Sequence, residues 1–411
     1  MANVHLCLLL AGLCALAYAH HVPDHHEDYE HQHDHHSEPC QKIAAGNADF
    51  AFRFYHQVAS DQPAGKNILF SPLSMSTAFA MLMLGAKSDT LNQLLSGLGF
   101  NQTEVSEQEI HEGFLHLLQK LNRPDAEIEF NIGNALFTNN ELQPLEKFLN
   151  DTKHYYQTEV HPTDFKNLTE AEGKINEFIE KKTHGKLVDV VKGLDPEVVM
   201  VLVNYMFLKA YWKEPFNPLS TREGDFYVDE ETTVKVDMMK KESLFKSYFD
   251  NDLSCHVVQL PYKGSASALF ILPKQGKMKQ VEEALGTALV AKWLNSLQSR
   301  RIDLSIPKFS MSSSYDVKEI LQKMGVTDVF TNGADLSGIT GKRNLKVSKA
   351  VHKAHLNVHE NGTEAAAATV LEVVFFTSFT PSIQFNHPFF MVFVKEDKIV
   401  LMGRVANPVG N

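Results

Sequence analysis

The chain has 411 residues, of which 44% are hydrophobic and 22% charged, and its formal net charge is −11 at pH 7. This hydrophobic share is ordinary for a globular core, whereas the excess of acidic residues argues against binding to nucleic acid or to an anionic membrane surface. Beyond its first residues, the sequence has no apolar run of about 20 residues that could cross a membrane.

Residues 1–19 have the pattern of a secretory signal peptide. Leu6 to Leu16 form an apolar core, and Ala17-Tyr18-Ala19 is a small-x-small cleavage site, although no Lys or Arg precedes the core. We therefore expect a secreted, extracellular protein.

Residues 20–44 are expected to form a disordered, acidic, histidine-rich tail. His20 to Glu38 holds eight histidines and no Lys or Arg, so it cannot bury a core. Such a tract can bind Zn²⁺ or Cu²⁺, but its spacing defines no coordination geometry, and we assign no metal site. The cysteines that remain after signal removal are Cys40, in this tail, and Cys255, in an apolar strand pattern. They form no disulfide framework, and we expect thiols or mixed disulfides.

The elements that follow suggest an α+β fold, with helices mainly in the first half and strands in the second. Phe50, Phe54 and Val58 form a helical stripe within residues 47–59. Ser71 and Pro72 suit the start of a second helix, which Gly85 ends. The predicted strands are 128–132, which alternates, 198–211, which is apolar throughout and so buried on both faces, and 255–260, 266–272, 302–306, 389–394 and 399–403.

No local motif indicates catalysis or a cofactor. The sequence has no Gly-x-Ser-x-Gly elbow, His-Glu-x-x-His helix, P-loop or Gly-x-Gly-x-x-Gly turn. We therefore expect neither an enzyme nor a bound cofactor.

The segment from Glu360 to Thr377 has the composition of a loop that can become a strand. It contains four small alanines and then β-branched and aromatic residues, with no proline from Gly362 to Thr380. With a period of two, one face is small and then apolar, and the other carries both charges. The first face comprises Thr363, Ala365, Ala367, Thr369, Leu371 and Val373. The second comprises Glu364, Ala366, Ala368, Val370, Glu372 and Val374, and is expected to face solvent.

This segment resembles the hinge and reactive-centre loop of the serpins, and other motifs match the same family in order. They are Asn67–Ser74 (NILFSPLS), Asn332–Gly338 (NGADLSG), Phe385–Phe389 (FNHPF) and Met402–Pro408 (MGRVANP). Lys349–Ala354 (KAVHKA) and Ile110–Phe114 (IHEGF) resemble the alpha-1-antitrypsin-like group. The resemblance implies one serpin domain over residues 45–411, with three β-sheets, eight or nine helices and an exposed loop at about 360–381.

The resemblance also implies a suicide-substrate inhibitor that forms a covalent complex with serine proteases as its loop inserts into the central sheet. Family spacing assigns the reactive bond to Phe376–Thr377, and an aromatic residue there suits a chymotrypsin-like or elastase-like target. A loop measured back from Phe385 gives Thr377–Ser378 instead. Phe375 and Phe379 also stay open.

Other positions correspond to family roles. The hinge comprises Glu360, Gly362, Thr363, Glu364, Ala365, Ala366, Ala367 and Ala368. Glu360 is expected to pair with Lys308, and Trp212 to lie beneath the insertion point. Ser71, Asn204 and His352 match the polar cluster where the central strands part.

Because a secreted protein can be glycosylated, we expect glycans at the sequons of Asn101, Asn150 and Asn167. We expect the fourth sequon, at Asn361, to carry no glycan because it lies in the hinge. We expect a monomer that polymerises on heating through loop–sheet pairing. Heparin binding is not expected, because Lys120 is the only basic residue in the interior of 110–122 apart from histidine. The alternatives are a non-inhibitory carrier and a plasma protein that binds metal through its histidine-rich tail.

Overall fold

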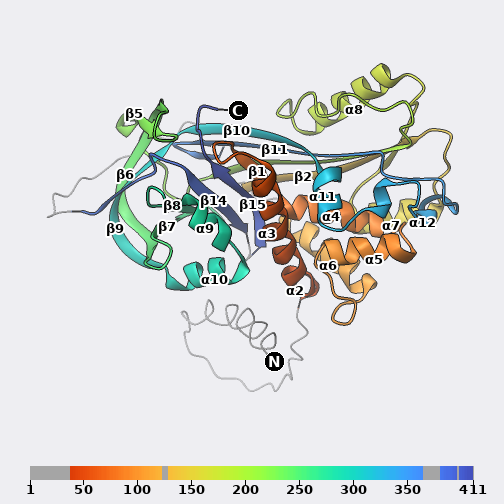
Figure 1. The fold of residues 1–411 in the computed structure, drawn as a ribbon, viewed down its shortest axis with the longest axis horizontal. Coiled ribbons are helices and arrows are strands. Elements are labelled where there is room, and N and C mark those ends of the chain that lie inside the picture. The colour runs from red at the N-terminus through yellow and green to blue at the C-terminus, as the bar shows by residue number, and fades with distance from the viewer. Residues whose placement is uncertain (1–37, 123–127, 364–379, 396–397, 411) are drawn as a thin grey trace, which may run out of the picture. The chain divides into compact units, whose positions relative to one another are not determined.

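The structure is a computed structural model that describes residues 38–122, 128–363, 380–395 and 398–410 (Figure 1). The expected signal peptide, most of the expected tail, hinge residues 364–368 and the expected reactive bond Phe376–Thr377 lie outside the described residues.

Eleven α-helices occur in the described part of the chain (Figure 1). The longer ones are α3 (Ala44–Asp61), α4 (Pro72–Met83), α5 (Ser88–Gly97), α6 (Glu107–Leu121), α7 (Glu146–Tyr156), α8 (Leu168–Lys182) and α10 (Thr287–Ser296). The shorter ones are α2 (Pro39–Lys42), α9 (Met278–Ala284), α11 (Val317–Lys323) and α12 (Ser337–Thr340). The number exceeds the expected eight or nine because it includes α2 and α12, which have only four residues each.

A six-stranded sheet has the order β10-β11-β12-β4-β2-β3. Its strands are β2 (Ile128–Asn139), β3 (Val160–Thr163), β4 (Met200–Tyr211), β10 (Phe309–Asp316), β11 (Lys349–His359) and β12 (Gly362–Thr363). Its central strands are nonconsecutive in sequence, and β4 and β11 run parallel to each other.

A nine-stranded sheet has the order β1-β15-β14-β8-β7-β6-β9-β13, with β5 paired to β6. Its strands are β1 (Ile68–Phe70), β5 (Arg222–Tyr227), β6 (Thr233–Asp250), β7 (Cys255–Pro261), β8 (Ala266–Pro273), β9 (Gln298–Pro307), β13 (Ser382–Gln384), β14 (Phe389–Lys395) and β15 (Lys398–Val405). Strand pairing thus gives two sheets within the described residues rather than three. The reason is that β6, which is 18 residues long, pairs with β5, β9 and β7 in turn and so joins what would otherwise be separate sheets.

Helix α4 lies in the core between the two sheets. All of its residues are buried, and it contacts β15 of one sheet and β4 of the other. Ser71 caps its amino end, because the Ser71 Oγ accepts a hydrogen bond from the Ser74 N–H at 3.2 Å, and Pro72 occupies its first turn. The predicted helix start is therefore confirmed, and the buried strand predicted at 198–211 is confirmed as β4.

The expectation of disorder over residues 20–44 is wrong for residues 38–44. Pro39–Lys42 form α2, and Cys40 and Ile43 are buried. Helix α2 contacts α6, and Ile43 packs against α6 at Gly113, where a Cβ would lie 2.8 Å from the Ile43 Cγ2. Tertiary packing thus orders a segment whose own composition is too polar to fold alone.

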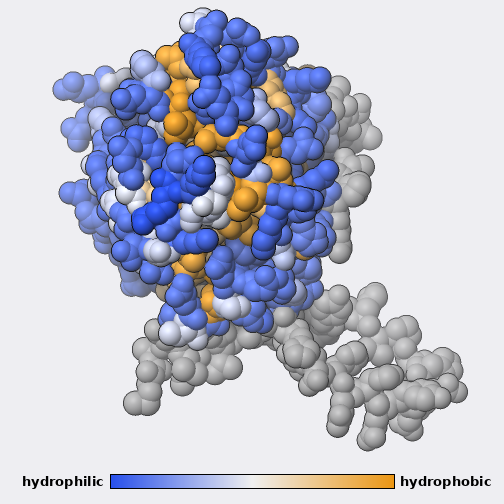
Figure 2. All heavy atoms as spheres, turned by 90° about the vertical axis from the view of Figure 1, so that its right-hand side faces the viewer, coloured by the Kyte–Doolittle hydropathy of each residue, from blue (hydrophilic) through white to orange (hydrophobic). Residues whose placement is uncertain are grey.

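The side of the molecule that carries α7, α8 and α12 is largely hydrophilic, with a narrow band of hydrophobic atoms (Figure 2). Large hydrophobic side chains that are exposed include Leu145, Leu149 and Val188. Among the described helices, none has the length and apolar character needed to span a membrane.

Candidate functional site

The central strands β4 and β11 separate at one end, and Gly362–Thr363, the start of the segment predicted to be a reactive-centre loop, lies between them. They pair directly where Val201–Phe207 faces Lys349–His355. Beyond that stretch, β12 lies between them and is antiparallel to both. Thr363 is opposite Ala210 of β4 and Val358 of β11. The first residues of the loop therefore already form part of the sheet.

Gly362 is the residue that permits this close approach. Its φ is +139°, and a Cβ there would lie only 2.1 Å from the Ala210 carbonyl oxygen. A side chain at this position would meet backbone atoms that cannot move aside. The next residue, Thr363, is fully buried, and its Oγ1 lies 3.0 Å from the Tyr262 Oη.

Trp212 holds the chain that enters the hinge. Its backbone N–H donates to the Asn361 carbonyl and its indole N–H donates to the His359 carbonyl, both at 2.9 Å. The indole is buried and stacks on Tyr262, with ring centroids 4.2 Å apart. The expected place of Trp212 beneath the insertion point thus corresponds to direct contacts with the loop base.

Glu360 is bound on both carboxylate oxygens. Its Oε2 lies 3.2 Å from the Lys308 Nζ, and its Oε1 accepts a hydrogen bond from the Thr221 hydroxyl at 2.8 Å. Burial raises the pKa of Glu360, but hydrogen bonds from its own backbone N–H, Thr221 and Lys308 outweigh burial and hold this pKa below its ordinary value. The carboxylate is therefore ionised at neutral pH and fixes the end of β11.

Ser71, Asn204 and His352 meet where β4 and β11 are still paired. The Ser71 N–H donates to the His352 Nε2 at 3.0 Å, and the Ser71 hydroxyl donates to the Val400 carbonyl at 2.6 Å. Since Nε2 accepts, the ring proton lies on Nδ1, which is 2.5 Å from the Asn204 Oδ1 and donates to it. This polar cluster links helix α4 to both central strands.

Burial lowers the pKa of His352 to about 3, so the ring is neutral at physiological pH. The neutral form is also the one that the hydrogen bonds require, because a protonated Nε2 would face the Ser71 N–H donor.

The sequence analysis missed three residues that complete these contacts. The Ser74 hydroxyl accepts from the Asn204 side-chain amide at 2.7 Å, Thr221 binds Glu360, and Tyr262 contacts Thr363. Ser74 had a local signal, because it lies one helical turn after the capping Ser71. Thr221 and Tyr262 had no local signal, since each lies more than 100 residues in the chain from the residue it contacts.

The expected glycosylation positions Asn101, Asn150 and Asn167 are all exposed, whereas Asn361 is only partly exposed. Cys40 and Cys255 are both buried thiols. Burial raises the pKa of the Cys255 thiol to about 12, which makes this thiol a poor nucleophile at neutral pH.

Comparison with known proteins decides the family. A family model described as Serpin (serine protease inhibitor) matches residues 45–408. The chain belongs to the serpin family. It is 46% identical over 403 residues to alpha-1-antiproteinase of Rattus norvegicus, covering 98% of this chain and 97% of that relative. It is 45% identical over 422 residues to kallistatin of Homo sapiens, covering 98% of each.

Solved serpins share the fold of this chain. Human thyroxine-binding globulin, solved with thyroxine, has a TM-score of 0.87 and 42% identity, covering 90% of this chain and 100% of that chain. Human glycosylated kallistatin has a TM-score of 0.86 and 45% identity, covering 91% and 100%. The expected α+β serpin fold is confirmed. The alpha-1-antitrypsin-like resemblance is confirmed as well.

Proposed function

We propose that this serpin is a secreted suicide-substrate inhibitor of serine proteases and has no catalytic activity of its own. The observation that supports this proposal is the entry of β12 between β4 and β11. The start of the loop already lies between these strands at one end, and a longer strand could separate them further along, where they now pair with each other.

The register of β12 can be continued along the seam between β4 and β11. Each step toward the carboxyl end of the loop moves one residue back along β4 and β11. In an inserted strand, Glu364 would fall beside Lys209, and Ala365 between Leu208 and Leu356. Thr369 would fall between Asn204 and His352.

The side chains along this seam suit those of the loop. On the face of Thr363, the neighbours of Ala365 and Ala367 are buried, so small side chains are required; these neighbours are Leu208, Leu356, Met206 and Ala354. On the opposite face, Lys209 is partly exposed and can pair with Glu364.

The opposite face is not solvent-exposed along its whole length, contrary to the expectation from sequence. Val201, Val203 and Val351 are buried there in a second hydrophobic cluster that includes Ile175 and Ile179 of α8. Val370 would join this cluster. Glu372 would fall beside Val201 and Lys349, and the lysine can neutralise its charge.

Insertion would exchange old contacts for new ones. The direct rungs between β4 and β11 and the hydrogen bond from His352 to Asn204 must break. A strand of a dozen residues forms new rungs on both sides, and at about 0.5–1.5 kcal/mol each these release on the order of 10 kcal/mol. The uncut protein would then be trapped kinetically in a state above its free-energy minimum.

The proposed mechanism uses the chemistry of the protease. The serine hydroxyl of the protease attacks the carbonyl carbon of Phe376, its proton passes to the Thr377 amine through the protease histidine, and an acyl-enzyme forms. Insertion of the freed segment carries the acyl-enzyme away and distorts the protease before water can hydrolyse the ester. We favour Phe376–Thr377 as the reactive bond, and its aromatic residue suits a chymotrypsin-like protease.

The test is incubation with a chymotrypsin-like protease. We expect a covalent complex that survives SDS and a released peptide that begins at Thr377 by mass spectrometry. Thr363→Arg is the matched variant: a buried arginine at the entrance should block insertion and convert the inhibitor into a cleaved substrate. Cleavage of the wild type without any SDS-stable complex would contradict the proposal.

The likeness to thyroxine-binding globulin supports a second candidate, a carrier of a small apolar molecule. The two candidate functions predict different melting temperatures for the protein after its loop is cleaved. An inhibitor should melt at a much higher temperature after cleavage of its loop, whereas a carrier with no insertion should melt as before.

We also propose secretion as a monomer, glycosylation at Asn101, Asn150 and Asn167, and polymerisation on heating. Peptide mapping of protein from the medium of expressing cells tests the first two. Native gels of heated samples test the third, since an unchanged monomer band would contradict it.

A further inference from the structure

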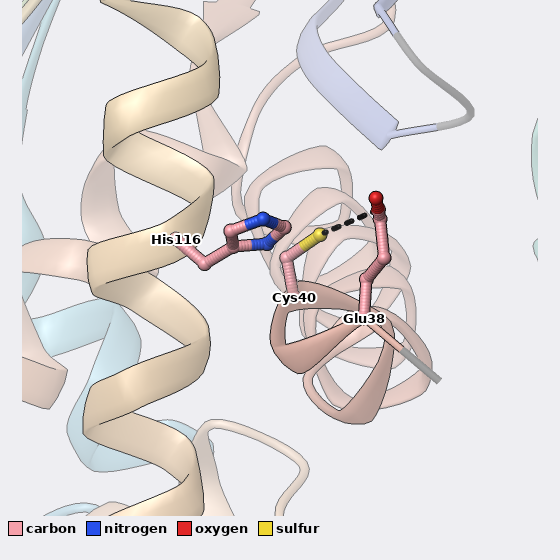
Figure 3. Close-up of side chains that lie close together, drawn as sticks. All are labelled: Glu38, Cys40 and His116. Carbon is pink, nitrogen blue, oxygen red and sulfur yellow. Dashed lines mark hydrogen bonds between the residues drawn. The ribbon is translucent and has the colours of Figure 1, made fainter. Parts of the chain in front are cut away.

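Glu38, Cys40 and His116 lie together where α2 meets α6 (Figure 3). Their ligand atoms all lie within 4.8 Å of one another, and the Cys40 Sγ is 4.0 Å from the Glu38 Oε2. Figure 3 shows the His116 ring pointing from its helix toward Cys40. Three different donor types thus converge from two segments that are about seventy-five residues apart in the chain.

The local fold holds these three side chains in place. Glu38 is the N-cap of α2 and Cys40 is its second residue. The helix lies close against α6 because Gly113 has no side chain, and a Cβ there would be 3.0 Å from the Pro39 carbonyl oxygen. His116 follows Gly113 by three residues, so it lies on the same face of α6.

His116 carries a second observation that points to a ligand. Its Nδ1 is buried, yet it has no hydrogen-bond partner in the described part of the chain. A buried imidazole nitrogen without a partner is costly unless something binds it. Cys40 is a thiol rather than half of a disulfide, so its sulfur is chemically able to bind a metal.

We propose that Glu38, Cys40 and His116 bind Zn²⁺. Thiolate, imidazole and carboxylate are the donors that zinc takes in proteins, and bonds of 2.0–2.3 Å in a tetrahedral site put ligand atoms about 3.5 Å apart. Rotation of the Glu38 and Cys40 side chains closes the remaining distance. Binding replaces the thiol proton by the metal, so one proton is released for each Zn²⁺ bound.

Water completes the tetrahedral site as the fourth ligand. Lys120 forms an ion pair with Glu38 and competes with the metal for this carboxylate. It must turn away when the metal binds.

The site is independent of the proposed inhibition. It would fasten the start of the folded domain to α6, while the loop base and the seam between β4 and β11 are made by other residues. Loss of one activity therefore leaves the other measurable.

The experiment is Co²⁺ titration of the full-length protein, followed by displacement with Zn²⁺. We expect a thiolate-to-Co²⁺ charge-transfer band in the near ultraviolet, with one equivalent bound and one proton released. Cys40→Ser should abolish the band, and Cys255→Ser, which changes the other buried thiol, should leave it intact. His116→Asn should weaken binding by more than about tenfold, whereas Lys120→Met should strengthen it by up to about fivefold.

A variant with the histidines of residues 20–36 replaced by asparagine tests whether Glu38, Cys40 and His116 suffice. The charge-transfer band should persist in this variant with unchanged affinity, and its loss would contradict the three-residue site. Absence of the charge-transfer band in the wild type, or equal binding by wild type and Cys40→Ser, would overturn the proposal and assign all binding to the histidine-rich segment.

Discussion

Protonation of His352 should weaken the contact between the two central strands. The ring is buried, its Nε2 accepts from Ser71 and its Nδ1 donates to Asn204. An added proton on Nε2 would oppose the Ser71 N–H and would carry a charge into the core. Lowering the pH from about 7.5 to about 5 is therefore a specific perturbation of this cluster.

The sign and size follow from the two pKa values. An exposed histidine in the unfolded chain has a pKa of about 6.5, and burial lowers the pKa of His352 to about 3 in the folded protein. The stabilisation from the neutral ring is fully present above the unfolded value and is lost as the pH falls from there toward the folded value. At 1.36 kcal/mol per pKa unit, the loss at pH 5 is about 2 kcal/mol.

The assay is denaturant unfolding at both pH values for the wild type and for His352→Gln, which cannot titrate. The variant should be less stable at neutral pH, by about 1–3 kcal/mol for disrupted buried hydrogen bonds. Its further loss on acidification should be about 2 kcal/mol smaller than that of the wild type. Other titrating groups are common to both proteins and cancel in this comparison. Equal losses on acidification would refute the assignment of a depressed pKa to His352.

Three further predictions concern the loop base. Gly362→Ala should displace β12 and lower the free energy of unfolding by more than about 1 kcal/mol, measured by denaturant titration, with Gly65→Ala as a control because a Cβ there meets nothing within 4 Å. Lys308→Met should cost less than about 1 kcal/mol in the same measurement, since its side chain is 37% exposed and solvent screens the ion pair with Glu360. Glycopeptide mapping should find Asn361 bare, because its side-chain Oδ1 is buried, and a glycan on Asn361 would contradict this geometry.

The sequence predicted those elements whose cause is local. The Ser71-Pro72 pair specifies a helix start by hydrogen bonding and by ring geometry within one turn, and the helix begins there. The apolar run that forms β4 needs two covered faces, and the structure covers both. Each of these signals lies within a few residues of the feature it determines.

Features that depend on distant partners could not be predicted in this way. Strand β6 is rich in lysine and mostly exposed or partly exposed, and it is held by backbone pairing to strands on its two sides rather than by burial. The polar sequence around Cys40 predicts a disordered tail, because the contact between α2 and α6 that buries Cys40 involves residues distant in the chain. The partners Tyr262 and Thr221 were missed for the same reason.

Two groups of residues in the candidate site act on the seam between β4 and β11. At one end, Gly362 lets the backbone enter between β4 and β11, and Glu360 and Trp212 fix the direction of entry. Farther along, His352 and Asn204 keep the strands joined until something stronger separates them. A hydrogen-bonded pair is suited to a contact that must open, because its hydrogen bonds can be exchanged for those of an incoming strand. A pair of packed apolar side chains would leave a cavity when the strands separate. Thr369 is the loop residue that would arrive between His352 and Asn204, and its hydroxyl can take up the hydrogen bonds that its arrival breaks.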